Sequence, residues 1–348
     1  MDEIPAHILR FVLGIGGGIV LGFAGRYGRF CTLGAIEDAT YASDWTRLRA
    51  WALAAALAIA LTQAMAFAEI IDLGRSIYLT AEIGWLGSII GGLMFGFGMA
   101  LVGTCGYGTL LRCGGGDLRA LIVFLVIAVT AYAAMRGLTG MGRLILIEPF
   151  RIDSTRIGGP SLAGSGGDLI AACISLGLVA ALLIFSLWKG LLPARPRLFL
   201  AATMIGTAVV FGWWATGVIA DDPFDPARIE SFSFVAPLGE TLVFIMLASG
   251  SRLDFMEGSV LGVLAGAFIA AHLAGEFRWE AYDDAREMKR HLGGAALMGT
   301  GGVTALGCTI GQGLTGVSTL SIASFLAIGA IFVGARAGLY WLVERWMR

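Results

Sequence analysis

The sequence predicts an all-α, polytopic membrane protein. Hydrophobic residues make up 57% of its 348 residues and charged residues 14%, whereas soluble domains contain roughly 45–50% and 25%. The mean hydropathy is +0.82. A soluble fold of this length could not hide so much apolar surface from water. The net charge of −1 provides no basic face, which argues against nucleic-acid binding.

Apolar runs predict where the membrane helices lie, because about 20 residues are needed to cross a bilayer. We expect nine transmembrane helices. They cover residues 8–24, 48–68, 84–104, 118–136, 168–189, 198–220, 256–274, 291–307 and 319–343. A tenth apolar run, at 237–250, has only 14 residues and carries Glu240. We expect that run to form a short re-entrant segment.

Positive charges predict the orientation of the chain. With nine spans, 15 Lys and Arg residues fall on one side and eight on the other, and Arg336 lies inside the last span. Counting a tenth span changes the division to 10 against 13 and nearly removes the asymmetry. Cytoplasmic loops are enriched in Lys and Arg. We therefore expect nine spans, with the N-terminus outside and the C-terminus in the cytoplasm.

Two stretches of the chain, 91–111 and 294–314, resemble each other at a constant offset of 203 residues. Each stretch ends a predicted span, breaks at a group of glycines and precedes another apolar run. The offset aligns Gly91 with Gly294, Gly96 with Gly299, Gly98 with Gly301, Cys105 with Cys308, Gly108 with Gly311 and Leu111 with Leu314. The shared cysteine makes a chance alignment of glycines a poor explanation.

The two stretches are predicted to run in opposite directions, because they end the third and the eighth of the nine spans. Inverted repeats with broken helices are a recurring transporter architecture. We expect repeats at about 8–136 and 198–343, joined by a linking helix at 168–189. In this hourglass arrangement, Cys105 and Cys308 face each other across a central constriction.

The cysteines do not form a redox or zinc motif, because none of the five belongs to a CxxC pair. Cys31 lies at a third glycine-flanked break, after the first span. Its equivalent region in the second half, 237–254, contains no cysteine. Cys173 lies within an apolar run and is expected to fill the core. The three histidines are far apart in the sequence, and we expect neither a metal site nor a cofactor.

The motifs around three cysteines resemble those of a known family. They are GRFC at 28–31, GTCGYG at 103–108 and GCTIGQGLTG at 307–316. With these motifs the chain resembles the YeeE/YedE family of sulfur-compound transporters. The resemblance implies thiosulfate uptake across a bacterial inner membrane, rather than an enzymatic activity. It also implies that Cys31, Cys105 and Cys308 line the narrow centre, beside a cytoplasmic TusA-like sulfur-carrier protein. Cys113 is not part of the family pattern.

Thiosulfate is a strongly hydrated dianion, so a constriction must replace its water with protein donors. Backbone N–H groups at the helix starts after Cys105 and Cys308 suit this purpose. Neutral thiols are weak, soft donors, and a series of weak sites permits conduction. We expect Thr309 and Gln312 to add neutral donors. Arg29 and Arg112 could balance the charge of the anion.

Three alternatives remain open from the sequence. The substrate could be another sulfur compound such as sulfite, or a selenium compound. A membrane thiol or persulfide sulfurtransferase would use the cysteines covalently, although the absence of CxxC counts against a redox enzyme. A membrane scaffold without transport activity is the third alternative.

Overall fold

The computed structural model describes residues 5–157, 159–162, 167–190, 192–222, 228–248, 254–282 and 284–344. Within these ranges the chain is mostly helical, and its only sheet pairs two short antiparallel strands, β1 (Glu82–Ile83) and β2 (Ile152–Asp153). Eight helical segments are long and apolar enough to cross a membrane. These findings confirm the predicted all-α polytopic class.

Eight long helices begin and end close to the predicted span limits. They are α1 (Ala6–Tyr27), α3 (Thr46–Phe67), α4 (Trp85–Val102), α6 (Leu118–Arg136), α8 (Gly167–Leu187), α9 (Pro196–Trp214), α11 (Phe255–Leu273) and α13 (Ile322–Leu339). The remaining predicted span, the eighth along the chain at 291–307, corresponds to α12 (Ala285–Thr304). This helix is long enough, but it does not meet the apolar criterion of the other eight. It begins earlier than predicted because Asp284 caps it, and its first turns therefore include charged residues such as Arg286.

Several short helices interrupt or follow the long ones. They are α2 (Thr32–Glu37), α5 (Gly106–Gly114), α7 (Leu138–Leu146) and α10 (Ala236–Met246). The 3₁₀ segments are η2 (Leu73–Arg75), η3 (Glu148–Phe150), η4 (Ser154–Ile157) and η5 (Trp188–Gly190). The π-helical segments are η1 (Asp38–Ala42), η6 (Ala215–Ile219), η7 (Gly311–Gly316) and η8 (Tyr340–Glu344). Helix α10 is the short segment expected at 237–250, and the end of that range lies outside the described residues.

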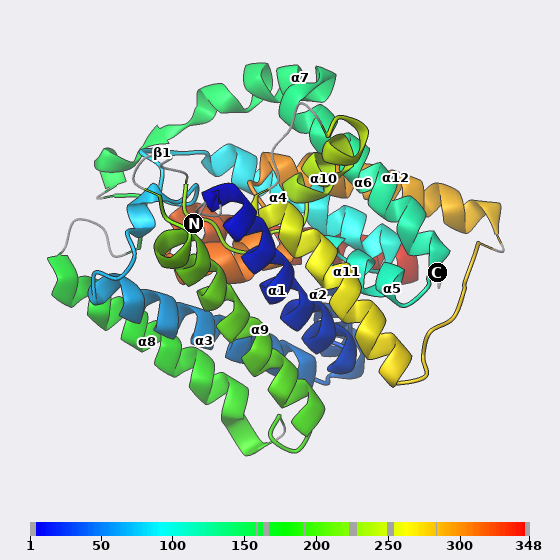
Figure 1. Ribbon diagram of the computed structural model, residues 1–348, viewed down its shortest axis with the longest axis horizontal. Coiled ribbons are helices and arrows are strands. Elements are labelled where there is room, and N and C mark those ends of the chain that lie inside the picture. Colours follow the sequence, from blue (N-terminus) through cyan, green and yellow to red (C-terminus); the bar gives the residue numbers. More distant parts are fainter. Residues whose placement is uncertain are drawn as a thin grey trace.

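Helix α7 was not expected from the sequence. Its nine residues are too few to register as a span, and it lies along one edge of the molecule in Figure 1. Leu138 and Ile145 on this helix are 84% and 70% exposed. A short helix with such an apolar outer face suits the interface between lipid and water.

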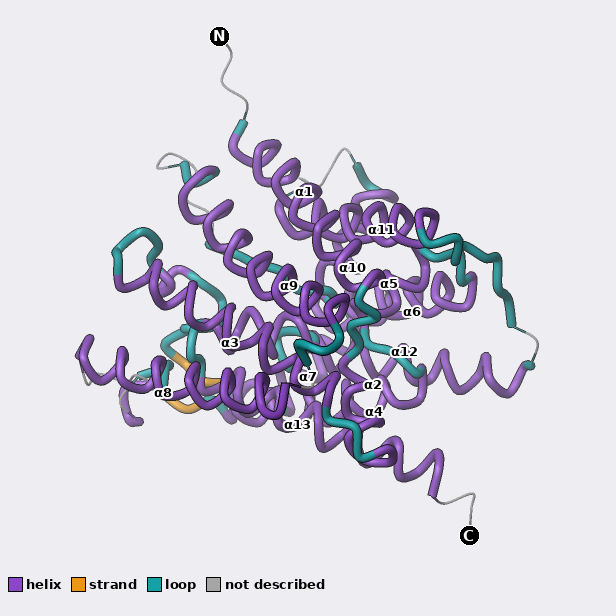
Figure 2. Tube along the Cα trace, turned by 90° about the horizontal axis from the view of Figure 1, so that it is seen from below, coloured by secondary structure: helices purple, strands orange, loops and turns teal. Residues whose placement is uncertain are grey.

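The long helices form closely packed pairs that join distant parts of the sequence. Helix α1 lies along α11, and α4 lies between α12 and α13. Helix α3 contacts both α8 and α9. The α1–α11 pair is visible in two orthogonal views (Figures 1 and 2).

Glycines allow α4 and α12 to approach each other at two crossing points. A Cβ on Gly98 would lie 2.5 Å from the carbonyl oxygen of Gly294, and a Cβ on Gly294 would lie 2.8 Å from that of Gly98. Gly91 and Gly301 face each other in the same reciprocal way, at 2.6 and 2.7 Å. The two helices therefore run antiparallel, and side chains at these positions would separate them.

Candidate functional site

A shared backbone motif surrounds the three cysteines of the predicted site. At each one a helix ends, the chain turns through a left-handed residue, and the cysteine two positions later caps the next helical segment. The left-handed residues are Arg29, Gly103 and Leu306, with φ values of 51°, 81° and 59°. Left-handed backbone is uncommon for residues other than glycine and concentrates at functional sites.

Each cysteine sulfur accepts a hydrogen bond from a backbone N–H three residues later. The donors are Gly34 for Cys31, Gly108 for Cys105 and Gly311 for Cys308, each with an N to Sγ distance of 3.4 Å. This bond uses the acceptor side of the sulfur and leaves the S–H donor for another partner. The sequence analysis missed this feature, although a Cys-x-x-Gly pattern is readable at all three positions.

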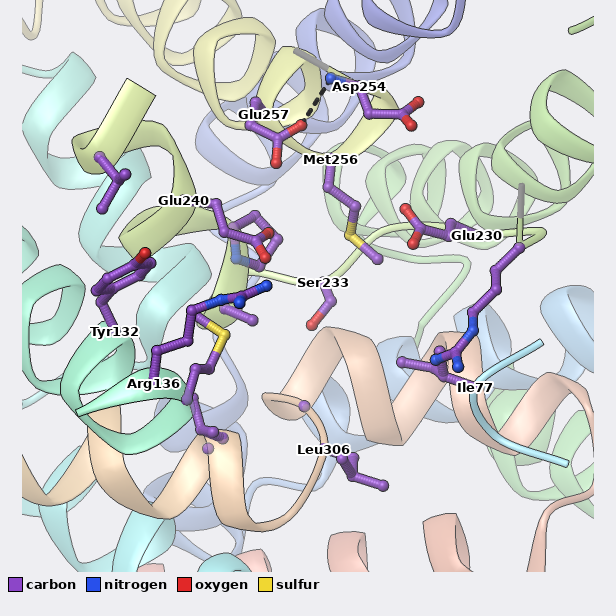
Figure 3. Close-up of a pocket in the computed structure, with 18 of the residues that line it drawn as sticks. Ile77, Tyr132, Arg136, Glu230, Ser233, Glu240, Asp254, Met256, Glu257 and Leu306 are labelled. Carbon is purple, nitrogen blue, oxygen red and sulfur yellow. Dashed lines mark hydrogen bonds between the residues drawn. The ribbon is translucent and has the colours of Figure 1, made fainter. Parts of the chain in front are cut away.

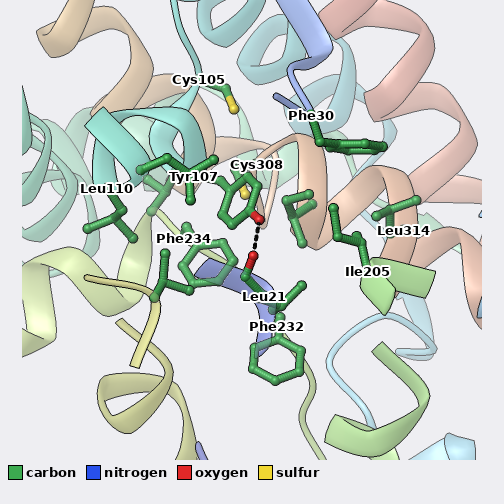
Figure 4. Close-up of a cluster of buried hydrophobic side chains, with 14 of the residues drawn as sticks. Leu21, Phe30, Cys105, Tyr107, Leu110, Ile205, Phe232, Phe234, Cys308 and Leu314 are labelled. Atoms are coloured by element: carbon green, nitrogen blue, oxygen red, sulfur yellow. Dashed lines mark hydrogen bonds between the residues drawn. The ribbon is translucent and has the colours of Figure 1, made fainter. Parts of the chain in front are cut away.

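The structure brings the three cysteines together in the core. Cys105 and Cys308 are 1% and 0% exposed, whereas Cys31 is half-buried. The thiols of Cys31 and Cys308 are both near enough to the Cys105 thiol to interact with it electrostatically. The hydroxyl of Thr309 also lies beside the Cys105 thiol. Figure 4 shows Cys105 and Cys308 on the same side of a group of buried aromatic rings.

Thr309 and Gln312, which the sequence analysis expects to add neutral donors, are buried next to these cysteines. They are 0% and 1% exposed. Within the described part of the chain, Oγ1 of Thr309 and Oε1 of Gln312 have no hydrogen-bond partner. The Nε2 group of Gln312 donates to the carbonyl oxygen of Ala305. Buried polar atoms rarely stay unpaired. The Thr309 hydroxyl can donate to a ligand at this place, but Oε1 of Gln312 can only accept, so Gln312 does not provide the expected free donor.

An aromatic residue occupies the position in the second half of the chain that corresponds to Cys31. Phe234 lies 203 residues after Cys31 in the sequence, just before α10, whose N-cap Val235 makes no side-chain capping bond. The backbone N–H of Phe234 faces the Cys308 thiol. Its ring centroid lies 5.3 Å from that of Tyr107. Figure 4 shows both rings in the buried aromatic group. The sequence analysis did not predict Phe234 as part of the site.

One cavity opens beside Cys31. We call it the arginine cavity, because Arg26, Arg29, Arg47 and Arg112 line its volume of 430 Å³ together with Cys31, Thr104 and Glu276. Arg29 and Arg112 therefore both lie near Cys31. The guanidinium of Arg29 donates to Glu276 at 2.9 Å, and Arg112 donates to the carbonyl oxygen of Gly103 at 3.1 Å. The bond from Arg29 lowers the pKa of Glu276 below its ordinary value.

A second cavity, of 830 Å³, opens next to the Cys308 loop. We call it the carboxylate cavity. Its charged lining residues are Glu230, Glu240, Asp254, Glu257, Arg136, Arg143 and Arg228. It also reaches Ser233 and Gly307, and Figure 3 shows the labelled side chains converging on the open space. The sequence analysis identified neither this cavity nor its cluster of charges.

The two cavities lie at opposite ends of α6. Asp117 caps its first turn on the side of Arg112, and Arg136 at its last residue lines the carboxylate cavity. A helix of 19 residues is about 28 Å long. Cys105 and Cys308 are buried between the arginine cavity and the carboxylate cavity.

The two remaining cysteines differ from these three. Cys113 is half-buried on α5 and lines neither cavity. Cys173 is exposed on α8, so the prediction that it fills the core was wrong. Helix α8 packs against α3 on one face only, and the apolar run that suggested a buried position is a membrane-facing surface instead.

Comparisons with known proteins agree with the cysteine motifs. Residues 27–337 match the family described as sulphur transport. The chain is 28% identical over 356 aligned positions to the thiosulfate transporter TsuA of Escherichia coli, covering 94% of this chain and 92% of that protein. It is 27% identical over 354 positions to the thiosulfate transporter TsuA of Spirochaeta thermophila, covering 94% and 97%. Since the family match covers most of the chain, the protein belongs to the sulphur transport family, as the resemblance of its cysteine motifs to the YeeE/YedE transporters predicts.

Proposed function

We propose that this protein is a multi-pass permease that takes up thiosulfate and passes the intact anion along Cys308, Cys105 and Cys31. One observation carries the proposal: three thiols share the same cap, and two of them, Cys105 and Cys308, are buried between the carboxylate cavity and the arginine cavity, which Cys31 lines. Both full-length relatives are thiosulfate transporters. The protein acts as a transporter and not as an enzyme.

The capped thiols account for how the anion loses its water. In the constriction, each S–H donates to the anion while the sulfur keeps its bond from the glycine N–H. A neutral thiol avoids the repulsion between a thiolate and a dianion, which amounts to about 4 kcal/mol per charge pair at close range and an effective dielectric near 20. The hydroxyl of Thr309 can donate to the anion at the same depth, whereas the Nε2 donor of Gln312 is bonded to Ala305. Several weak contacts in series let the anion leave as readily as it binds.

The proposed architecture is a pair of inverted repeats at about 8–136 and 198–343, joined by α8. Helix contacts support it, because contacts in one half have counterparts in the other. The α1–α11 contact corresponds to α9–α3, α4–α13 to α12–α6, and α5–α6 to η7–α13. The two reciprocal glycine crossings of α4 and α12 also exchange under the offset of 203 residues. A two-fold axis in the membrane plane would produce this pattern.

The proposed location is the bacterial inner membrane, with the N-terminus outside and the C-terminus in the cytoplasm. This orientation puts the carboxylate cavity on the uptake side and the arginine cavity on the cytoplasmic side. We propose that Arg29 and Arg112 balance the charge of the anion as it leaves Cys31. A TusA-like sulfur carrier is the proposed cytoplasmic partner.

Uptake by the purified protein tests this function. Proteoliposomes containing the protein should accumulate radiolabelled thiosulfate faster than empty liposomes, and unlabelled thiosulfate should compete better than sulfate. Sulfite and selenium oxyanions belong in the same competition panel. If the rate with protein equals that of empty liposomes, the proposed function is wrong.

A further inference from the structure

The carboxylate cavity contains an arginine with no direct partner. Arg136 is the last residue of α6 and lines this cavity. Its guanidinium makes neither an ion pair nor a hydrogen bond with any residue in the described ranges. In Figure 3 the side chains of Arg136 and Glu240 point toward one another across the open space. An exposed guanidinium in a cavity presents several donors to an incoming anion.

The carboxylates around Arg136 have contacts with other groups. Asp254 caps α11 and lies 3.8 Å from Arg10. Glu257 accepts the backbone N–H of Asp254 at 2.9 Å in the same capping box. Glu240 contacts Glu257. Asp254 and Glu257 are thus engaged at the start of α11, whereas Glu240 lies near enough to Arg136 to interact with it electrostatically.

The charges of the cavity do not favour a dianion when every group is ionised. The charged and titratable groups around it are Arg10 on α1, Tyr132 and Arg136 on α6, Arg143 on α7 with its partner Glu148, Arg228 and Glu230 before α10, Glu240 on α10, and Asp254 and Glu257 on α11. Three arginines and four carboxylates line the cavity itself, so their net charge is −1. Such a lining repels thiosulfate unless protons reduce its negative charge.

One lining carboxyl group has an environment that favours its protonated form. Burial, reinforced by the carboxylates of Asp254, Glu257 and Glu240, raises the pKa of Glu230 to about 8. Below that pH the protonated Glu230 changes the lining charge from −1 to 0. If protons improve anion binding, the bound anion must improve proton binding to the same extent.

We propose that Arg136 is the first anion-binding residue of the uptake side, that Glu240 competes with the anion for it, and that the anion binds best when protonation makes the lining of the cavity least negative. This inference rests on the proposed function. From Arg136 the cavity leads to Ser233 and Gly307, next to Cys308. The anion reaches the first thiol by this route.

Concentration-dependent uptake by three variants tests the role of Arg136. Arg136→Gln should raise the KM for thiosulfate by about tenfold or more with a nearly unchanged maximal rate, because it removes charge-assisted hydrogen bonds made during binding. Arg136→Lys, which keeps the charge but loses the fork of donors, should give an intermediate KM. Glu240→Gln should lower KM, because it removes the competing carboxylate.

The pH dependence of KM in the same assay tests whether protonation of the cavity lining favours binding of the anion. As the external pH rises through about 8, Glu230 ionises and the KM of the wild type should increase. Glu230→Gln should have a flatter profile. At equal thiosulfate concentration, uptake should be faster with the exterior below pH about 8 than with the exterior above it.

Arg286→Gln is the matched control, since it removes an exposed arginine at the other end of the molecule and should leave KM unchanged. An unchanged KM in Arg136→Gln, or in Glu240→Gln, would overturn the inference while leaving thiosulfate transport intact. If Arg136→Gln does not fold, the opposite shifts expected for Arg136→Lys and Glu240→Gln decide the question. Absence of uptake by the wild type would refute the proposed function instead.

Discussion

Cys308→Ala and Cys105→Ala should each strongly slow thiosulfate uptake while the protein still inserts and folds. Both thiols are buried in the constriction, and alanine leaves no donor for an anion that has lost its water there. A hydrogen bond to a charged group contributes about 1.5–3 kcal/mol. Losing one at the narrowest point should therefore slow uptake by about tenfold or more. The measurement is the initial uptake rate in proteoliposomes, normalised to reconstituted protein.

Two further substitutions separate donor loss from misfolding. Cys173→Ala changes an exposed cysteine on α8 and should leave the uptake rate unchanged. Cys308→Ser keeps a small hydrogen-bond donor and should retain part of the activity. Full transport by Cys308→Ala would show that this thiol is not on the path of the anion.

Gly294→Val should destabilise the protein severely, whereas Gly293→Val should be tolerated. A Cβ on Gly294 would lie 2.8 Å from the carbonyl oxygen of Gly98 and 2.8 Å from side-chain carbons of Leu101 and Val102. A Cβ on the neighbouring Gly293 would meet nothing within 4 Å. Overpacking of this kind costs about 1–3 kcal/mol, and more where the backbone itself must move.

Adjacent positions on one helix make this comparison well controlled. Both variants introduce the same β-branched residue into α12, so its effect on helix propensity cancels. The melting temperature of the detergent-solubilised protein should fall for Gly294→Val and stay close to the wild type for Gly293→Val. Equal melting temperatures for the two variants would contradict the close contact between α4 and α12.

The spans and the central cysteines were predictable from the sequence, because their signals are local. An apolar run of about 20 residues reveals a membrane helix without any knowledge of its neighbours. The cysteine at the same place in two similar stretches marked Cys105 and Cys308. Helix α12 was harder, because only its second half is apolar and its charged first turns hid where it begins.

The carboxylate cavity was not predictable, because its members come from separate elements. Arg136, Glu230, Glu240 and Glu257 share no local spacing, and only folding brings them to one space. Phe234 was missed because the equivalent of the Cys31 region was expected at 237–254, although the offset of 203 residues aligns Cys31 with Phe234. The bonds that cap the thiols could have been anticipated from the repeated Cys-x-x-Gly pattern.

The most direct test of the account asks whether thiosulfate crosses as an intact ion. Two preparations of thiosulfate, one labelled on the outer sulfur and one on the sulfonate sulfur, are supplied to proteoliposomes that contain only this protein. A relay of hydrogen-bonding thiols predicts equal initial uptake rates for the two labels. Uptake of the outer sulfur without the sulfonate sulfur would mean that a cysteine takes the sulfur covalently, and would contradict the account.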